Sequence, residues 1–134
     1  MSDLNKTAFF KRLFIAFPLP FKLRENIYNY VSFLKEFNSN IRIIPPQNIH
    51  ITLKFLGNIY ENKIDKISQA ISSTAKKFSK FKYSIGNIIE AFPSLKCARV
   101  VFIPVVSGNK EMLEIFSELE NNLSKIKVRK EQRK

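Results

Sequence analysis

The sequence has little of several residue types on which common classes of functional site depend. Its 134 residues include one cysteine, Cys97, and one histidine, His50, with three glycines and no tryptophan. A single cysteine excludes an internal disulfide and a cysteine-based metal site, and a single histidine excludes the usual histidine-pair zinc site. Metal catalysis is therefore a poor starting hypothesis, and we predict no metal-binding residues.

Long apolar runs are missing as well. No stretch approaches the ~20 apolar residues that a transmembrane helix needs. The apolar stretch Leu13–Phe17 is cut by Pro18 and Pro20 before it could form the core of a signal peptide. We therefore expect a cytoplasmic protein with no membrane partner.

Acidic residues are scarce, since 11 of them face 23 basic ones and leave a net charge of +12. Such an excess gives a positive field suited to phosphate-bearing partners, either nucleic acid or an anionic membrane surface. The chain as a whole is 45% hydrophobic and has 13 phenylalanines, a composition typical of a protein that folds around a hydrophobic core. At this length a single domain is expected.

Hydrophobic spacing predicts the order of strands and helices along the chain. Residues 1–11 are predicted to be a loose leader, and Ala91–Lys96 a loop. Predicted strands are Arg12–Phe17 (buried), Asn48–Leu56 (half-buried), Phe81–Ile85 and Arg99–Ile103 (buried). Predicted helices are one of about four turns that opens at Pro20 and runs to Phe37, one over residues 64–78, and one from Asn109 to Ile126. This order indicates an α+β fold with a mostly antiparallel sheet.

The strand Asn48–Leu56 carries a row of polar side chains. Because successive side chains of a strand alternate between its faces, one face holds Ile49, Ile51, Leu53 and Phe55, and the other holds His50, Thr52 and Lys54. We predict that the apolar face is buried, with Phe55 in the core. His50 and Thr52 are then expected to point into a shared groove, and Lys54 to be a solvated lysine.

The chemistry of this row suits a phosphate group. An imidazole moves a proton near neutral pH, a threonine hydroxyl donates to a phosphoryl oxygen, and an ammonium offsets negative charge. The spacing alone leaves open the simpler interpretation that the row is the solvent face of an antiparallel strand. Two further residues are weaker candidates: an arginine such as Arg99 could meet RNA phosphate but more commonly forms a surface ion pair, and Cys97 is interpreted as a small hydrophobe at a loop end.

Three segments resemble a known family. RLFIAFPLP at residues 12–20, NIHITLKFLGNI at 48–59 and FPSLKCARVVFIP at 92–104 are similar to the 2H phosphoesterase superfamily. The resemblance is to its bacterial and archaeal branch of RNA 2′,3′-cyclic phosphodiesterases, historically called 2′-5′ RNA ligases. It implies a two-lobed antiparallel-sheet fold in one domain over residues 1–134, with a first lobe at about 12–90 and an incomplete second lobe at about 91–134.

The resemblance also implies roles for two residues. Each lobe of this family contributes one His-x-Thr-x motif, and the first motif corresponds here to residues 50–53. By this resemblance His50 is the catalytic proton donor and Thr52 binds the phosphoryl oxygens of the substrate, without any cofactor. The second motif would follow Lys125–Lys134, so the chain resembles a C-terminally truncated relative. We therefore expect hydrolysis of 2′,3′-cyclic phosphate RNA ends to 2′-phosphates to be impaired.

Other functions stay open at this point. The chain could be a catalytically inactive module that binds RNA ends or small cyclic nucleotides. A third hypothesis, a membrane-surface or partner-binding protein that uses the basic residues after Lys125, ranks last because no tryptophan or phenylalanine anchor lies near Ile126 and Val128. The complete fold is expected to be a monomer. An open sheet edge or apolar face in the second lobe would allow this chain to self-associate.

Overall fold

The computed structural model describes residues 10–37, 40–92 and 100–128. Its internal contacts divide the chain into two compact units, Met1–Ile59 and Tyr60–Lys134. Within the described ranges, no helix is both long and apolar enough to cross a membrane. The lobe boundaries expected near residue 90 stay a prediction.

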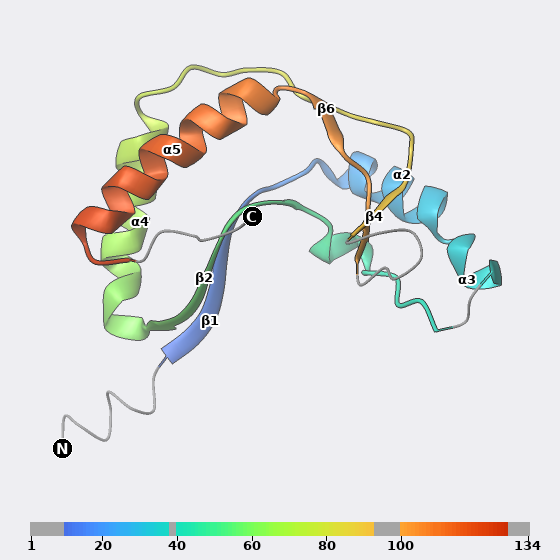
Figure 1. Ribbon diagram of the computed structural model, residues 1–134, viewed down its shortest axis with the longest axis horizontal. Coiled ribbons are helices and arrows are strands. Elements are labelled where there is room, and N and C mark those ends of the chain that lie inside the picture. Colours follow the sequence, from blue (N-terminus) through green and yellow to red (C-terminus); the bar gives the residue numbers. More distant parts are fainter. Residues whose placement is uncertain (1–9, 38–39, 93–99, 129–134) are drawn as a thin grey trace. The chain divides into compact units, whose positions relative to one another are not determined.

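The first unit pairs two strands and adds a short helical layer. Strands β1 (Phe10–Phe17) and β2 (Ile51–Tyr60) lie side by side in a two-stranded sheet, with the last residue of β2 already in the second unit (Figure 1). Between them the chain forms α2 (Phe21–Val31), α3 (Leu34–Phe37) and the 3-10 turn η1 (Pro46–Asn48). Helix α2 packs against η1. This contact brings the start of α2 to the chain that enters β2.

The helix predicted from Pro20 to Phe37 is two helices. Pro20 caps α2 with an extended backbone, as predicted for a proline that opens a helix. The helix ends at Val31, and α3 begins at Leu34. At the break, the Ser32 hydroxyl donates a hydrogen bond to the Tyr28 carbonyl. A serine that bonds a carbonyl four residues earlier slightly destabilises a helix and often bends it, which hydrophobic spacing alone does not reveal.

Two strands that were predicted to be buried are not. No residue of β1 is buried, and all three residues of β5 (Val100–Phe102) are exposed. Apolar runs indicate a strand, but burial depends on whether another layer covers it, and β5 pairs with β4 in a two-stranded sheet. The apolar side chains of β5 and of Val106 are open to solvent, which agrees with the open apolar face predicted for this region.

The second unit contains a helix pair and two small antiparallel sheets. Helices α4 (Ile64–Ala75) and α5 (Asn109–Lys125) pack side by side, and the 3-10 turn η2 (Glu61–Lys63) leads into α4 (Figure 1). Both helices were predicted from their apolar spacing. The residues they bury are Ile67, Ala70, Thr74, Met112, Leu119, Glu120 and Leu123.

The strands of the second unit are shorter than the sequence predicts. Strand β3 (Ser84–Ile85) pairs with β6 (Val105–Ser107), and β4 (Glu90–Phe92) pairs with β5; both pairs are antiparallel. The loop predicted from Ala91 was wrong at its start, because Ala91 and Phe92 pair with Val101 and Val100. Strands of two or three residues are too short to be recognised from hydrophobic alternation. The α+β class with antiparallel pairs is confirmed.

Candidate active site

His50 lies between η1 and β2 and is held through both of its ring nitrogens. Its Nδ1 is 2.6 Å from the Asn48 carbonyl oxygen, and its Nε2 is 2.9 Å from the Thr52 hydroxyl oxygen. A carbonyl oxygen only accepts hydrogen bonds, so Nδ1 must carry the hydrogen in this contact. Nε2 is therefore the nitrogen left to gain or release a proton, and it points at Thr52.

An aromatic contact fixes the plane of the His50 ring. The ring of Phe14, from β1, stacks on the imidazole with centroids 4.7 Å apart and planes 22° apart. Phe55 of β2 lies beyond it, with its centroid 6.4 Å from that of Phe14. Phe14 remains 48% exposed. The imidazole is thus oriented by two hydrogen bonds and one stacked ring while its surroundings stay accessible.

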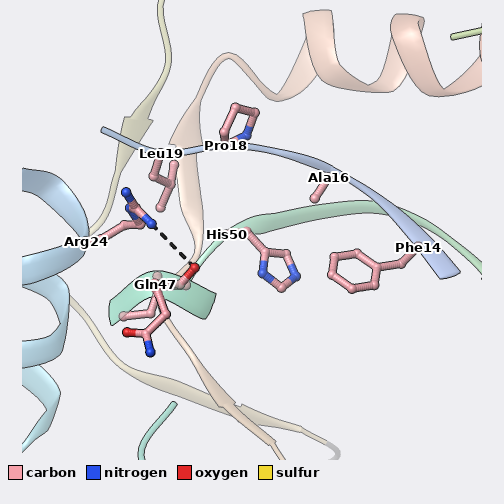
Figure 2. A pocket seen from close by; sticks show the side chains of 8 residues that line it. Phe14, Ala16, Pro18, Leu19, Arg24, Gln47 and His50 are labelled. Atoms are coloured by element: carbon pink, nitrogen blue, oxygen red, sulfur yellow. Dashed lines mark hydrogen bonds between the residues drawn. The ribbon is translucent and has the colours of Figure 1, made fainter. Parts of the chain in front are cut away.

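A pocket opens beside His50, entirely within the first unit. It encloses about 440 Å³ and is lined by Phe14, Ala16, Pro18, Leu19, Arg24, Gln47, Ile49 and His50. Figure 2 shows the Phe14 and His50 rings facing each other on one side of the pocket and Arg24 on the other. Strand β1, the start of α2 and η1 each supply part of the wall. A cavity of this size is typical of small-ligand sites.

Arg24 brings a cation to this mostly apolar wall. Its Nη1 donates to the Gln47 backbone carbonyl over 3.4 Å, drawn as a dashed line in Figure 2, and its guanidinium carbon lies 5.7 Å from the centroid of the Phe21 ring. The Arg24 Nε is buried without a hydrogen-bond partner in the described part of the chain. A guanidinium has five N–H donors. Within the described ranges, most of the donors of this guanidinium therefore make no hydrogen bond to the protein.

The two site residues predicted from the sequence are brought together. His50 and Thr52 are both partly exposed and hydrogen-bonded to each other, and His50 lines the pocket. Neither residue is buried, but Thr52 is not among the residues that line the pocket, so the groove expected to be shared by both stays a prediction. His50 itself precedes β2, whose first residue is Ile51, and Asn48 belongs to η1.

The predictions for their two neighbours were wrong. Lys54 is 1% exposed, although we expected it to be solvated, and Phe55 is 51% exposed, although we expected it in the core. A period of two shows which residues share a face of a strand, but it does not show which face another layer covers. The long aliphatic stem of a lysine packs as an apolar side chain does, and Phe55 instead adjoins the exposed ring of Phe14.

Sequence reasoning did not single out Phe14, Arg24 or Gln47 as site residues. Phe14 lay in a segment interpreted only as a buried strand, and Arg24 is one of 23 basic residues with no motif around it. Arg24 and Gln47 are brought together by the packing of α2 on η1, and Phe14 is brought to the site by the pairing of β1 with β2. Arg99 and Cys97 lie outside the described residues. Over the ranges that are described, no three His, Cys, Asp or Glu residues gather in a way that could hold a metal ion.

A comparison with protein families shows the family of the chain. Residues 17–102, a range that includes Arg24, His50 and Thr52, match the sequence profile described as LigT like Phosphoesterase. The chain belongs to the LigT-like phosphoesterase family. The resemblance inferred from its three segments is thereby confirmed.

Similar LigT-like proteins are known from several archaea. The RNA 2′,3′-cyclic phosphodiesterase of Methanothermobacter thermautotrophicus is 31% identical over 112 residues, which cover 84% of this chain and 58% of that protein. The enzyme of the same name from Methanocaldococcus jannaschii is 33% identical over 121 residues, which cover 90% of this chain and 64% of that protein. The chain thus spans about three-fifths of the length of these relatives.

A solved structure shows the same fold. The crystal structure of E. coli LigT complexed with 3′-AMP superposes with a TM-score of 0.68 at 22% identity, and covers 93% of this chain and 68% of that one. The α+β architecture with antiparallel sheets is therefore that of the LigT fold.

Proposed function

We propose that this LigT-like chain binds RNA ends that carry a 2′,3′-cyclic phosphate and opens that phosphate to a 2′-phosphate. In this proposal His50 is the proton donor and Thr52 binds the phosphoryl oxygens. The observation that carries it is the 2.9 Å contact between His50 Nε2 and the Thr52 hydroxyl, with Nδ1 fixed on a backbone carbonyl. Relatives named RNA 2′,3′-cyclic phosphodiesterase support the substrate class.

The proposed step uses the proton on His50 Nε2. Water attacks the phosphorus and releases one of its protons to the solvent, the P–O3′ bond breaks, and the Nε2 proton passes to the departing O3′. The products are a 2′-phosphate and a free 3′-hydroxyl. The Asn48 carbonyl accepts from Nδ1–H throughout, so it favours the ring orientation in which Nε2 faces the substrate. The Thr52 hydroxyl, already next to Nε2, donates to the phosphoryl oxygen whose negative charge grows.

A second candidate function is favoured by the single histidine of the sequence. The reaction needs a base that activates water as well as an acid, and His50 supplies one of the two. General acid and base groups each contribute about 10²–10⁴ in rate. We therefore expect slow turnover by this chain, and binding without turnover is the alternative outcome.

A hydrolysis assay tests the proposal. The 134-residue chain is incubated with an oligonucleotide ending in a 2′,3′-cyclic phosphate, and the 2′-phosphate product is followed over time. We expect turnover that His50→Ala lowers by about 10²-fold or more. Lys66→Ala, an exposed change on α4 in the other unit, serves as the matched control and is expected to leave the rate unchanged.

The binding of the same oligonucleotide is measured in parallel. Binding that Thr52→Val weakens, with no product at any time, would identify the chain as the binding module of the second candidate. Turnover that His50→Ala leaves at the rate of the parent chain, or neither binding nor turnover, would contradict both.

A further inference from the structure

The pocket beside His50 has walls that suit a nucleobase. Five of its eight lining residues are apolar: Phe14, Ala16, Pro18, Leu19 and Ile49. A phosphate group placed against such walls would lose water without regaining hydrogen bonds, whereas the flat faces of an aromatic base bury well there. The volume of about 440 Å³ lies within the range of about 300–1,000 Å³ that is usual for small-molecule pockets.

One polar group in this wall has donors to spare. Within the described ranges, Arg24 donates one hydrogen bond, a long one of 3.4 Å to the Gln47 carbonyl, and its Nε has no partner. Unmet donors next to apolar walls cost free energy that a ligand bearing acceptors would recover. The planar guanidinium presents its N–H groups as a fork, which pairs with two acceptors lying side by side.

We infer that this pocket is a nucleobase subsite and that Arg24 determines its base preference; the inference rests on the proposed function, which places the phosphoryl group at His50 and Thr52. Two bases present two adjacent acceptors on one edge: guanine through O6 and N7, and cytosine through O2 and N3. Adenine and uracil alternate donors and acceptors and offer no such pair. The subsite therefore favours guanine and cytosine over adenine and uracil.

The test measures, by calorimetry, the affinity of the whole chain for the four nucleoside 2′-monophosphates, which correspond to the last nucleotide of the proposed RNA product. We expect the guanine and cytosine nucleotides to bind about tenfold tighter than the other two, the size expected of one bidentate pair. Arg24→Met is expected to remove this difference. Arg24→Lys keeps the charge but replaces the fork by a point charge, so it too should lose the discrimination while retaining affinity for phosphate.

Lys22→Met, an exposed change on the same helix that does not line the pocket, is the control and should keep the discrimination. Should Arg24→Met fail to fold, Arg24→Lys still decides the question. Equal affinities for all four nucleotides in the parent chain, lowered alike by Thr52→Val, would overturn the base subsite and leave the proposed function standing. No measurable affinity for any nucleotide would instead overturn the proposed function.

Discussion

The two units of this molecule differ in how many of their side chains are buried. In the second unit, the facing sides of α4 and α5 bury a row of side chains, among them Leu119 and Leu123 at 1% and 0% exposure. In the first unit, no residue of β1, α2 or η1 is buried, and the described residues that are buried are Leu19, Lys54 and Ile59. The candidate site lies in this more open unit.

The contrast agrees with the roles that we propose for the two units. A helix pair excludes water by packing apolar stripes together, and it gains free energy in proportion to the area it buries. A site for a phosphate and a base needs accessible walls and polar groups whose hydrogen bonds are not all satisfied by the protein, as at Arg24. Packing changes should therefore act mainly in the second unit, and binding changes mainly in the first.

The largest stability effect is expected at the centre of the helix pair. Leu123→Ala removes a side chain that is 0% exposed and should lower the free energy of unfolding by about 2–5 kcal/mol. Leu113→Ala on the same helix, at a residue 65% exposed, is the matched control and should cost less than about 0.5 kcal/mol. Urea unfolding measures both. Equal losses of unfolding free energy at the two positions would contradict the description of α5 as a helix with one packed face and one exposed face.

A smaller effect is expected at the polar contact between the helices. The Thr74 hydroxyl donates to the Ala70 carbonyl and accepts from the Asn122 side-chain amide, both over 2.8 Å, and Thr74 is 2% exposed. Thr74→Val keeps the shape but leaves the amide without this acceptor, so we expect a loss of about 1–2 kcal/mol. Ser124→Ala, which removes an exposed hydroxyl bond, should cost less. A Thr74→Val chain as stable as the parent would show that packing alone holds the two helices.

The smallest effect is expected at the surface and depends on pH. The hydrogen bond that Lys77 donates to Glu118, 2.6 Å long, holds the pKa of the Glu118 carboxyl below its ordinary value. A carboxyl whose pKa is lower in the folded state contributes stability above its unfolded pKa, and this contribution is lost as the pH falls through the folded pKa. Glu118→Gln should therefore be less stable than the parent at neutral pH and equally stable at low pH.

The urea midpoints of the parent and of Glu118→Gln are compared from about pH 7 to pH 3, a range that spans the ordinary glutamate pKa of about 4.3. The change in the difference between the two midpoints measures the contribution of this carboxyl. Because the side chain of Lys77 is 60% exposed, salt should reduce it. A difference between the two chains that persists unchanged at the acid end would contradict the assignment to this carboxyl.

The parts of the fold that the sequence predicts are those set by local pattern. The apolar period of 3.6 residues predicted α4 and α5, and the period of two placed His50 beside Thr52. The pattern did not predict which face of β2 is covered, so Lys54 and Phe55 were assigned the wrong environments. Arg24 and Phe14 reach the site through packing between distant segments, and no spacing within one segment encodes such contacts. Hydrophobic spacing alone would also continue the first helix past Ser32, whose hydroxyl bonds the Tyr28 carbonyl at the break.

The most direct test of the central claim uses the one histidine of the chain as its own probe. Because His50 is unique, its ring gives a single set of nuclear magnetic resonance signals, which need no assignment by mutation. Titration with an oligonucleotide ending in a 2′-phosphate should shift these signals to saturation, and Thr52→Val should weaken the binding they report. The ring nitrogen signals of the neutral form should show the hydrogen on Nδ1. Binding detected by calorimetry that leaves every His50 signal in place would contradict a phosphoryl site at His50 and Thr52.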